Sequence, residues 1–484
     1  MIKAIGISIL SASYMYAASQ TLTLEDAINI ALKNNQELKI SHSALEIANS
    51  MYKQALSANY PSIDFDAKLT RFDEAATFDM RGSTTVDNTQ TKQIYTNLAN
   101  AATADGNNTL AATYNGIVSS TPNQTSLPIN MDVKIMGRDS ALGQLNLTYP
   151  LYTGGKISSI IEQAKLGKLI ATKGKERTRN EVIYDVKRYY YASLFAKKLK
   201  KLTIDTIDRM SFIEELTSEL YQGGSMSVKK TDYLRSKLSV DMIRSFYETI
   251  VEKEQMSKSA LVFAMGLSWK EDIELAQNDF ETPMLNSSMQ ALVEDAYKFN
   301  PQYTTLKLAI NVNEERINEA KSENYPQVGL FGNVQELYND YDYGVVNDTN
   351  KSSWTIGVGL KYNLFNGLRT SNKIEQSKFE KNKLVQQELL LREGIALQMK
   401  HSFLKMSTSY KQFKILKNTI KTAHENRDLN TRAYQEDLVS TKDVIESQLF
   451  ESFVKADYYR SLHDHFVSKA SLNFIVGNAI ESKK

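Results

Sequence analysis

Hydrophobic positions change their spacing abruptly at two places along the chain. In ALSANYPSIDF at 55–65, a helix-favouring run stops at Tyr60-Pro61, and apolar residues then alternate with polar ones. The segment AKSENYPQVGLF at 320–331 repeats this change at Tyr325-Pro326. Proline cannot continue a helix, and it biases the preceding residue toward extended backbone. Each Tyr-Pro pair is therefore predicted to be a joint between a helix and a strand.

The segments that precede these joints are related in the same register. TLTLEDAINIALKNNQEL at 21–38 opens with Thr23 as a predicted N-cap, and its apolar residues share one helical face. A later segment, MQALVEDAYKFNPQY at 289–303, matches this one. The offset in residue number is the same as the offset between Tyr60 and Tyr325. A constant offset indicates an internal duplication, so we predict two tandem structural repeats at 20–283 and 284–484, each opening with a helix.

Two strands are predicted in each repeat. Apolar and polar residues alternate at about 62–72 and 142–152 in the first repeat, and at about 327–338 and 353–365 in the second. A period of two gives a sheet one apolar and one polar face. Such a sheet suits a barrel wall between lipid and water, and it equally suits one side of a soluble sandwich.

The connection between the two strands is longer in the first repeat. The second strands of the two repeats also match, in LNLTYPLYTGGK at 145–156 and VGLKYNLFNGLR at 358–369. Their offset in residue number is smaller than the offset between the two joints. The first repeat therefore contains an insertion between its two strands. Residues 73–140 are rich in Asn, Thr, Ala, Ser and Gly and have little apolar periodicity. This composition predicts a long exposed loop.

Long helical patterns follow each strand pair, at about 156–266 and about 369–477. Within 195–220, apolar residues recur at heptad spacing, which Thr206 and Arg209 interrupt. The turn-like segments YQGGSMS and YQEDLVS divide the two patterns. We therefore expect two hairpins of long helices, the first helix being roughly 100 Å long at 1.5 Å per residue.

The N-terminal segment, 1–19, has the features of a secretory signal peptide. Lys3 precedes a mostly apolar stretch, and Ala17 and Ser19 fit the small positions of a cleavage site before Gln20. The apolar stretch is short and interrupted by serine, which is atypical of a membrane anchor. A buried N-terminal helix is the alternative.

Composition and motifs speak against several classes of protein. A net charge of +2 provides no strongly positive surface for binding nucleic acid. The absence of cysteine excludes disulfide bonds and a thiol nucleophile. No phosphate loop, nucleophile elbow or metal-ligand spacing occurs. His463 and His465 stand two residues apart in a helical pattern, and so on different helix faces. We predict no enzyme, no cofactor and no metal site.

Taken in order, these features resemble the TolC-like outer-membrane efflux protein family over the whole mature chain. The resemblance rests on the duplicated first helix, the Tyr-Pro joints, YPLYTGGK, and the turn patterns SVKKTDYLRSKL and STKDVIESQL. It implies an α+β membrane protein of the bacterial outer membrane. In that fold a homotrimer builds one twelve-stranded transmembrane β-barrel from four strands per protomer, and a long α-helical barrel continues it into the periplasm. Residues 73–140 would then be extracellular.

The resemblance also implies a function. Members are passive exit ducts of tripartite efflux or type I secretion systems, surrounded by outer-membrane lipid. They are coupled through a periplasmic adaptor (a membrane fusion protein) to an inner-membrane transporter of RND or ABC type. The alternative is a secreted or surface coiled-coil adhesin or scaffold that binds through its Asn- and Thr-rich loop.

A gate at the periplasmic hairpin turns is the third implication. Asp443 and Glu446 share a helix face and would ring the narrow end of the tunnel, raising some pKa values and attracting cations. Thr231 and Asp232 stand where the family places partners that hold the gate shut, and Tyr434 is the matching tyrosine. Without the resemblance, the two acids are a solvated face.

Two details of the second turn depart from the family or allow another role. Asp437 stands where a turn glycine is expected, and Val439 stands where a gate arginine is expected. Ser440 and Asp443 also have the spacing of a helix-capping box, which gives the acid a structural role.

Aromatic residues cluster near the predicted strand ends. They are candidates for a girdle at the membrane interface, although ordinary strand packing would also explain them. These residues are Trp354, Tyr149, Tyr152, Tyr362 and Phe365. The tyrosines of the joints, Tyr60 and Tyr325, also suit an interface between membrane and water.

Overall fold

The computed structural model describes residues 21–276, 287–341 and 351–477, so the predicted signal peptide lies outside the described residues. Contacts divide the chain into two compact units. One contains most of the helices, and the other, Ser57–Gly154 with Glu323–Phe365, contains the strands. Within the described ranges, no helix combines the length and apolar content needed to cross a membrane.

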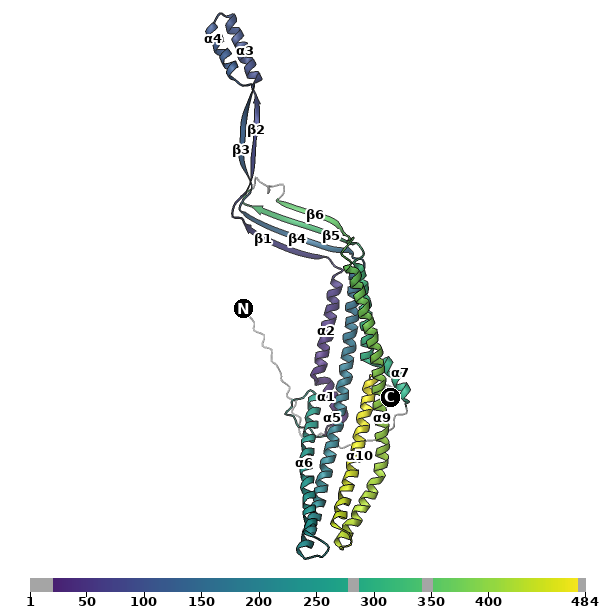
Figure 1. The fold of residues 1–484 in the computed structure, drawn as a ribbon. Helices are drawn as coiled ribbons and strands as arrows, with labels where there is room; N and C mark the ends of the chain where they lie inside the picture. Colours follow the sequence, from purple (N-terminus) through teal and green to yellow (C-terminus); the bar gives the residue numbers. More distant parts are fainter. Residues whose placement is uncertain (1–20, 277–286, 342–350, 478–484) are drawn as a thin grey trace, which may run out of the picture. The chain divides into compact units, whose positions relative to one another are not determined.

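Four helices of the first repeat have counterparts of equal length in the second (Figure 1). Helices α1 (Leu24–Asn34) and α7 (Met289–Phe299) have 11 residues, and α2 (Gln36–Ser57) and α8 (Pro301–Ser322) have 22. Helices α5 (Lys156–Gln222) and α9 (Arg369–Gln435) have 67 residues, and α6 (Lys230–Ala264) and α10 (Thr441–Ile475) have 35. Such equality is what a duplicated sequence produces.

An asparagine breaks the helical segment before each first strand, a feature that the sequence did not reveal. The Asn35 side chain accepts a hydrogen bond from Glu37 N at 2.8 Å and donates to the carbonyl of Ala264 at 2.8 Å. Asn300 repeats this arrangement by donating to the carbonyl of Ile475 at 2.9 Å. Each asparagine therefore caps one helix and clamps it to the last helix of its own repeat.

Four antiparallel strands form the main sheet, in the order β1-β4-β5-β6 (Figure 1). They are β1 (Ser62–Arg71), β4 (Asp139–Tyr152), β5 (Gln327–Asn339) and β6 (Ser352–Lys361). The last strand ends earlier than the predicted residue 365, because the chain turns into α9 through left-handed residues at Gly367 and Leu368.

Cross-strand pairing gives the sheet alternating apolar and polar rows. One row consists of Phe65, Leu145, Val334 and Trp354, and the next consists of Asp66, Gln144, Gln335 and Ser353. The polar face is linked by side chains, since Asn146 donates to Asp66 and Asn333 donates to Asn146, both at 2.7 Å. The apolar row is exposed at all four residues. The sheet therefore has two chemically distinct faces, one of them apolar.

Residues 73–140, predicted to be a long exposed loop, contain regular secondary structure instead. Strands β2 (Ala76–Asp87) and β3 (Gln124–Met136) form a ribbon, and helices α3 (Thr89–Ala104) and α4 (Asn108–Ser120) connect them (Figure 1). The segment has little apolar periodicity because the ribbon is largely exposed and the two helices pack through small residues. The buried residues of this pair are Ala99, Ala102 and Ala111. Alanine contributes little to a hydrophobic pattern, so the helices escaped prediction.

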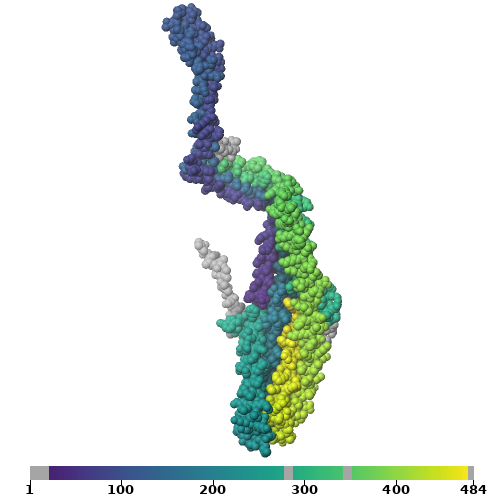
Figure 2. Space-filling model, viewed as in Figure 1, coloured from purple at the N-terminus to yellow at the C-terminus, as the bar shows by residue number. Residues whose placement is uncertain are grey.

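In the helical unit, α5 packs against α6, α8 and α10, while α9 packs against α10 and α8. Figure 2 shows the hairpins α5–α6 (dark teal) and α9–α10 (green to yellow) lying against one another. Three ring contacts join α5 to α10: Tyr184 with Phe474, Tyr191 with Phe466, and Phe195 with His463.

Candidate functional site at the hairpin turns

A side-chain contact joins the turns of the two hairpins. Ser227 Oγ donates to the two carboxylate oxygens of Asp437, at 2.6 and 2.7 Å. Asp437 has φ 60°, so it occupies the left-handed position for which the sequence suggested a glycine. Aspartate tolerates this backbone conformation better than most residues do. Its side chain also provides an acceptor that glycine lacks.

Tyr434 is buried between the hairpins and has different partners from those expected. Its hydroxyl lies 2.9 Å from Thr217 Oγ1 and 3.0 Å from Thr441 Oγ1. The carboxylate of Asp232 instead accepts a hydrogen bond from Lys229 N at 3.0 Å and lies 3.5 Å from Arg235. Within one chain, Tyr434 therefore bonds two threonines and Asp232 bonds the start of its own helix, while a link from Tyr434 to Asp232 of a neighbouring hairpin stays a prediction.

Asp443 and Glu446 lie on an exposed face of α10, one turn apart. Asp443 accepts hydrogen bonds from Ser440 N at 3.1 Å and Ser440 Oγ at 2.7 Å, which completes the capping box foreseen from the sequence. The bonds from Ser440 lower the pKa of Asp443, so this carboxyl is ionised at neutral pH. Glu446 lies 3.7 Å from Lys442. Thr231 is exposed at the start of α6.

A buried ionic cluster lies further from the turns, and sequence reasoning missed it. The carboxylate of Glu451 on α10 is 0% exposed. It contacts Arg427 and Lys455 at 2.7 Å each, and His424 at 3.2 Å. Burial alone would raise the pKa of Glu451, but Lys455, Arg427 and Arg209 together lower it. The carboxylate is therefore ionised and paired.

The first hairpin contributes two residues of α5 to this cluster. Arg209 lies 3.9 Å from Glu451 and donates to Gln448 at 3.1 Å. Thr206 Oγ1 lies 2.8 Å from Ser452 Oγ. Thr206 and Arg209 are the polar residues that interrupt the predicted heptad pattern. The interruption is the sequence feature from which this cluster could have been predicted, because a polar residue at a core position needs a buried hydrogen-bond or ionic partner.

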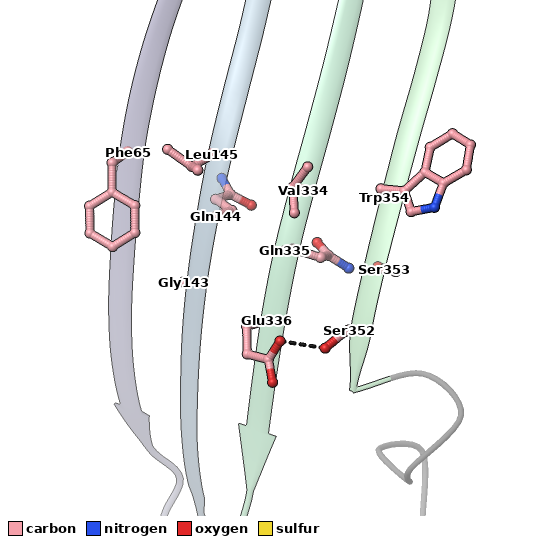
Figure 3. A pocket seen from close by; sticks show the side chains of 10 residues that line it. All are labelled: Phe65, Gly143, Gln144, Leu145, Val334, Gln335, Glu336, Ser352, Ser353 and Trp354. Carbon is pink, nitrogen blue, oxygen red and sulfur yellow. Dashed lines mark hydrogen bonds between the residues drawn. The ribbon is translucent and has the colours of Figure 1, made fainter.

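The apolar face of the sheet carries a shallow hollow of about 430 Å³ (Figure 3). Phe65, Leu145, Val334 and Trp354 lie across it, and Gly143 leaves space beside them. Glu336 is the carboxylate at this hollow, and Ser352 donates a hydrogen bond to it. The hollow offers apolar surface and one satisfied acid, which suits contact with apolar groups rather than a reaction.

The predicted interface aromatics lie at both ends of β6 and at the end of β4. Trp354 is exposed near the first residue of β6, and Tyr362 and Phe365 are exposed beyond its last. Tyr152 ends β4 and is exposed, whereas Tyr149 is half-buried. These positions are compatible with two interfacial bands.

Both Tyr-Pro joints have the same local structure. Helix α2 ends at Ser57 and α8 ends at Ser322, and a strand begins directly after each proline. Tyr60 and Tyr325 are exposed. Tyr60 N donates to the carbonyl of Ser57 at 2.9 Å, which closes the turn before the proline. The joints are therefore where helix changes to strand, as the sequence predicted.

His463 and His465 face different helices. His463 stacks on Phe195 of α5, while His465 Nδ1 lies 3.4 Å from the carbonyl of Met406 on α9. In the described ranges, no three His, Cys, Asp or Glu side chains are grouped as a metal ion would require.

Comparison with known families gives a match in the second repeat. Residues 292–448 match the family described as outer membrane efflux protein. The matched segment runs from α7 into α10, and so covers most of the described second repeat. This match confirms the resemblance inferred from the sequence. A comparison with curated proteins gives no match.

Solved structures of outer-membrane channels share the fold. The CmeC outer membrane channel of Campylobacter jejuni superimposes with a TM-score of 0.73 at 14% identity, covering 99% of this chain and 93% of that one. The outer membrane protein VceC of Vibrio cholerae gives 0.71 at 14% identity, with 94% and 96% covered. The open MtrE channel of Neisseria gonorrhoeae gives 0.68 at 13% identity, with 94% and 88% covered.

Proposed function

We propose, from the family match and the fold shared with solved channels, that this chain is the outer-membrane duct of a tripartite efflux or type I secretion system. The strand unit would lie in the bacterial outer membrane, and the helical unit would extend into the periplasm. The observation that carries the proposal is the four-stranded sheet with an exposed apolar face and a hydrogen-bonded polar face. Lipid on one side and water on the other would satisfy both faces.

The two outermost strands of the sheet support a closed assembly. Strands β1 and β6 are the outer strands, and each would leave a row of backbone groups without a strand partner. In lipid, each such group is costly unless it is paired. Pairing β6 of one copy with β1 of the next, in a homotrimer, would close a twelve-stranded transmembrane barrel. The aromatics at the strand ends would then lie at its two interfaces.

The helical unit supports a water-filled continuation of the duct. Helices of 67 and 35 residues carry many charged side chains and only narrow buried strips. A hollow helical barrel needs this distribution, because water contacts both its inner and outer surfaces. The partners in such a system are a periplasmic adaptor and an inner-membrane transporter of RND or ABC type.

The exposed acids at the hairpin turns are the proposed gate. Asp443 and Glu446 would contribute six carboxylates to the narrow end of a trimeric duct and attract cations there. Ser227–Asp437 and the Tyr434 contacts would hold the turns of each protomer together in the closed state. Thr231 and Asp232 lie at the start of α6, where they would face a neighbouring hairpin.

Bilayer recording of detergent-extracted protein tests the proposal. We expect a trimer by size, recovered in the outer-membrane fraction, that conducts ions when it is inserted in a planar bilayer. A water-soluble oligomer without conductance would contradict it and favour the scaffold or adhesin. A trimer lacking residues 76–136, which contain β2, α3, α4 and β3, should still conduct, because that segment is outside the proposed sheet.

A further inference from the structure

We propose that the ribbon of β2 and β3 packs one face against the same face of two further copies of this chain, around the threefold axis of the proposed trimer. The ribbon is a separate two-stranded sheet, so this contact involves neither the main sheet nor the long helices. The inference rests on the proposed homotrimer and adds a contact made by the inserted segment of the first repeat.

Cross-strand pairing gives the ribbon two chemically different faces. Residues directly opposite each other in an antiparallel pair lie on the same face. One face carries the pairs Phe78–Val133, Met80–Met131, Gly82–Ile129, Thr84–Leu127 and Val86–Thr125. The other face carries the pairs Thr77–Lys134, Asp79–Asp132, Arg81–Asn130, Ser83–Pro128 and Thr85–Ser126. We call the first the apolar face of the ribbon and the second its polar face.

The apolar face is exposed to solvent in a single chain. Phe78 is 59% exposed and Met131 is 57% exposed, and the side chains of Met80, Val86 and Leu127 are also exposed. A continuous apolar surface on a folded protein marks a site of contact. A two-stranded ribbon is also only marginally stable by itself in water. Both facts indicate that another surface covers this face.

The polar face does not supply the missing stability. Asp79 and Asp132 lie directly opposite each other, and like charges in this position destabilise a strand pair. A side-chain hydrogen bond with Asp132, together with its negative charge, raises the pKa of Asp79. The stabilising contacts of the ribbon must therefore come from its apolar face.

The charges of the inserted segment argue against a membrane surface as the cover. Residues 76–136 contain four acidic and three basic side chains. A segment that lies on anionic lipid through an apolar face needs an excess of Lys and Arg on its polar face. The two strands also lack tryptophan and tyrosine, the residues that commonly anchor a protein at a lipid interface.

The base of the ribbon is fixed to the main sheet. Phe72 N donates to the carbonyl of Arg138 at 2.8 Å, which continues the pairing of β1 with β4 toward the ribbon. Gly137 N donates to Asn339 Oδ1 at 2.7 Å, and a Cβ at Gly137 would collide with the carboxylate of Asp340. Each ribbon therefore starts from one defined place on its sheet.

The proposed trimer would bring three such ribbons around one axis. Groups tethered to one assembly meet at an effective concentration in the millimolar range, so a modest apolar contact between them forms readily. A partner that arrives from solution lacks this advantage. The two other copies are therefore the occupants that the arrangement favours, and each apolar face would be covered by the same face of its neighbours.

Single cysteines provide the test, because the chain contains no cysteine of its own. Met131→Cys places a thiol in the middle of the apolar face. Asn130→Cys is the matched control, because this neighbour in β3 lies on the polar face. Leu127→Cys and Ser126→Cys form a second matched pair, so that poor folding of one variant does not decide the result. Around a threefold axis, equal positions of the three copies face one another.

Detergent-extracted trimer is treated with a short bismaleimide and separated under denaturing conditions. We expect Met131→Cys and Leu127→Cys to give a strong band of linked dimer. A monomer band should remain, because one linker joins only two of the three chains. Asn130→Cys and Ser126→Cys should give at least ten-fold less dimer.

A fluorescent label separates a second copy from lipid as the cover. Met131→Cys is labelled with bimane, and the protein is inserted in vesicles of lipopolysaccharide and brominated phosphatidylethanolamine. We expect the bromine atoms to leave the bimane emission unchanged. Quenching by the brominated lipid would show that the apolar face lies on the membrane, and would overturn the contact between ribbons.

The outcomes also separate this inference from the proposed function. A trimer of the expected size in which neither apolar-face cysteine is cross-linked overturns the ribbon contact and leaves the duct intact. Equal cross-linking from the apolar and polar faces overturns it as well. Extraction of only monomers would contradict the proposed trimer and the ribbon contact together.

Discussion

Ser227 and Asp437 are 210 residues apart in the sequence, yet their side chains bond across the turns of the two hairpins at 2.6 and 2.7 Å. The contact is exposed, so it contributes about 1 kcal/mol. That is enough to change a two-state ratio by about five-fold.

Removing this contact should favour the open gate. Ser227→Ala is expected to raise the ratio of open to closed time in bilayer recordings about five-fold, without a change in ion preference. Asp437→Asn keeps an acceptor and tolerates the left-handed backbone, so it serves as the control and should shift the ratio less. Unchanged gating in Ser227→Ala would show that the turns are held together by other contacts.

Neutralising the exposed acids should change selectivity instead of gating. Asp443→Asn with Glu446→Gln keeps side-chain size, so the duct should lose cation preference and block by multivalent cations. Asn also keeps an acceptor for Ser440, which preserves most of the helix cap. Measured reversal potentials equal to those of the parent protein would identify the two acids as a solvated helix face.

Glu451→Gln should destabilise the helical unit. It leaves Arg427, Lys455 and Arg209 partly buried without their shared carboxylate, and breaking a buried pair in this way costs about 3–5 kcal/mol. Thermal unfolding followed by circular dichroism should show a clear fall in Tm. Glu254→Gln is the matched control, because Glu254 is a buried acid that pairs with lysines of the first hairpin and should cost less.

The effect of Glu451→Gln should depend on pH. The folded pKa of Glu451 is lowered, so its contribution is fully present above the ordinary glutamate pKa of about 4.3. It is lost as the pH falls through the lower folded pKa. The Tm difference between the two proteins should persist from pH 8 to pH 5 and should shrink below about pH 4. A difference that is already lost at pH 6 would assign the stability to another group.

Gly357 should be required in the sheet. A Cβ at this position would lie 2.6 Å from Cζ of Phe331, whose ring covers the glycine on the neighbouring strand. Gly357→Ala should therefore reduce the yield of folded, heat-modifiable protein on gels. Gly82→Ala, in the exposed ribbon, meets nothing within 4 Å and should fold normally. Equal yields of the two variants would contradict the close contact.

Insertion of an epitope tests the proposed orientation. A tag at Asn107, between α3 and α4, should bind antibody on intact cells, whereas a tag at Gly224 in the first hairpin turn should not. Permeabilised cells provide the control for expression of the second tag. Labelling of both sites from outside would contradict a periplasmic position for the turns.

The four strands of the main sheet and the two hairpins lie within a few residues of their predicted bounds, because alternation and proline placement are local signals, whereas β2 and β3 were not predicted. It missed the bonds of Tyr434 to Thr217, and of Arg209 to Gln448, because these partners lie more than two hundred residues apart in the sequence. It also missed α3 and α4, whose buried alanines carry no hydrophobic periodicity. The local sequence pattern therefore predicts the helices and strands, whereas the side-chain bonds between the hairpins can be identified only from the folded structure.

The clamps formed by Asn35 and Asn300 have a consequence for how such a chain can arise and be rearranged. Each clamp joins the first helices of a repeat to the end of its last helix. The beginning and the end of each repeat therefore lie close together in the structure. A gene encoding one repeat would preserve its clamp, and six such products would supply the same number of repeats as three full chains. A permuted gene, with the second repeat placed before the first, would also retain both clamps.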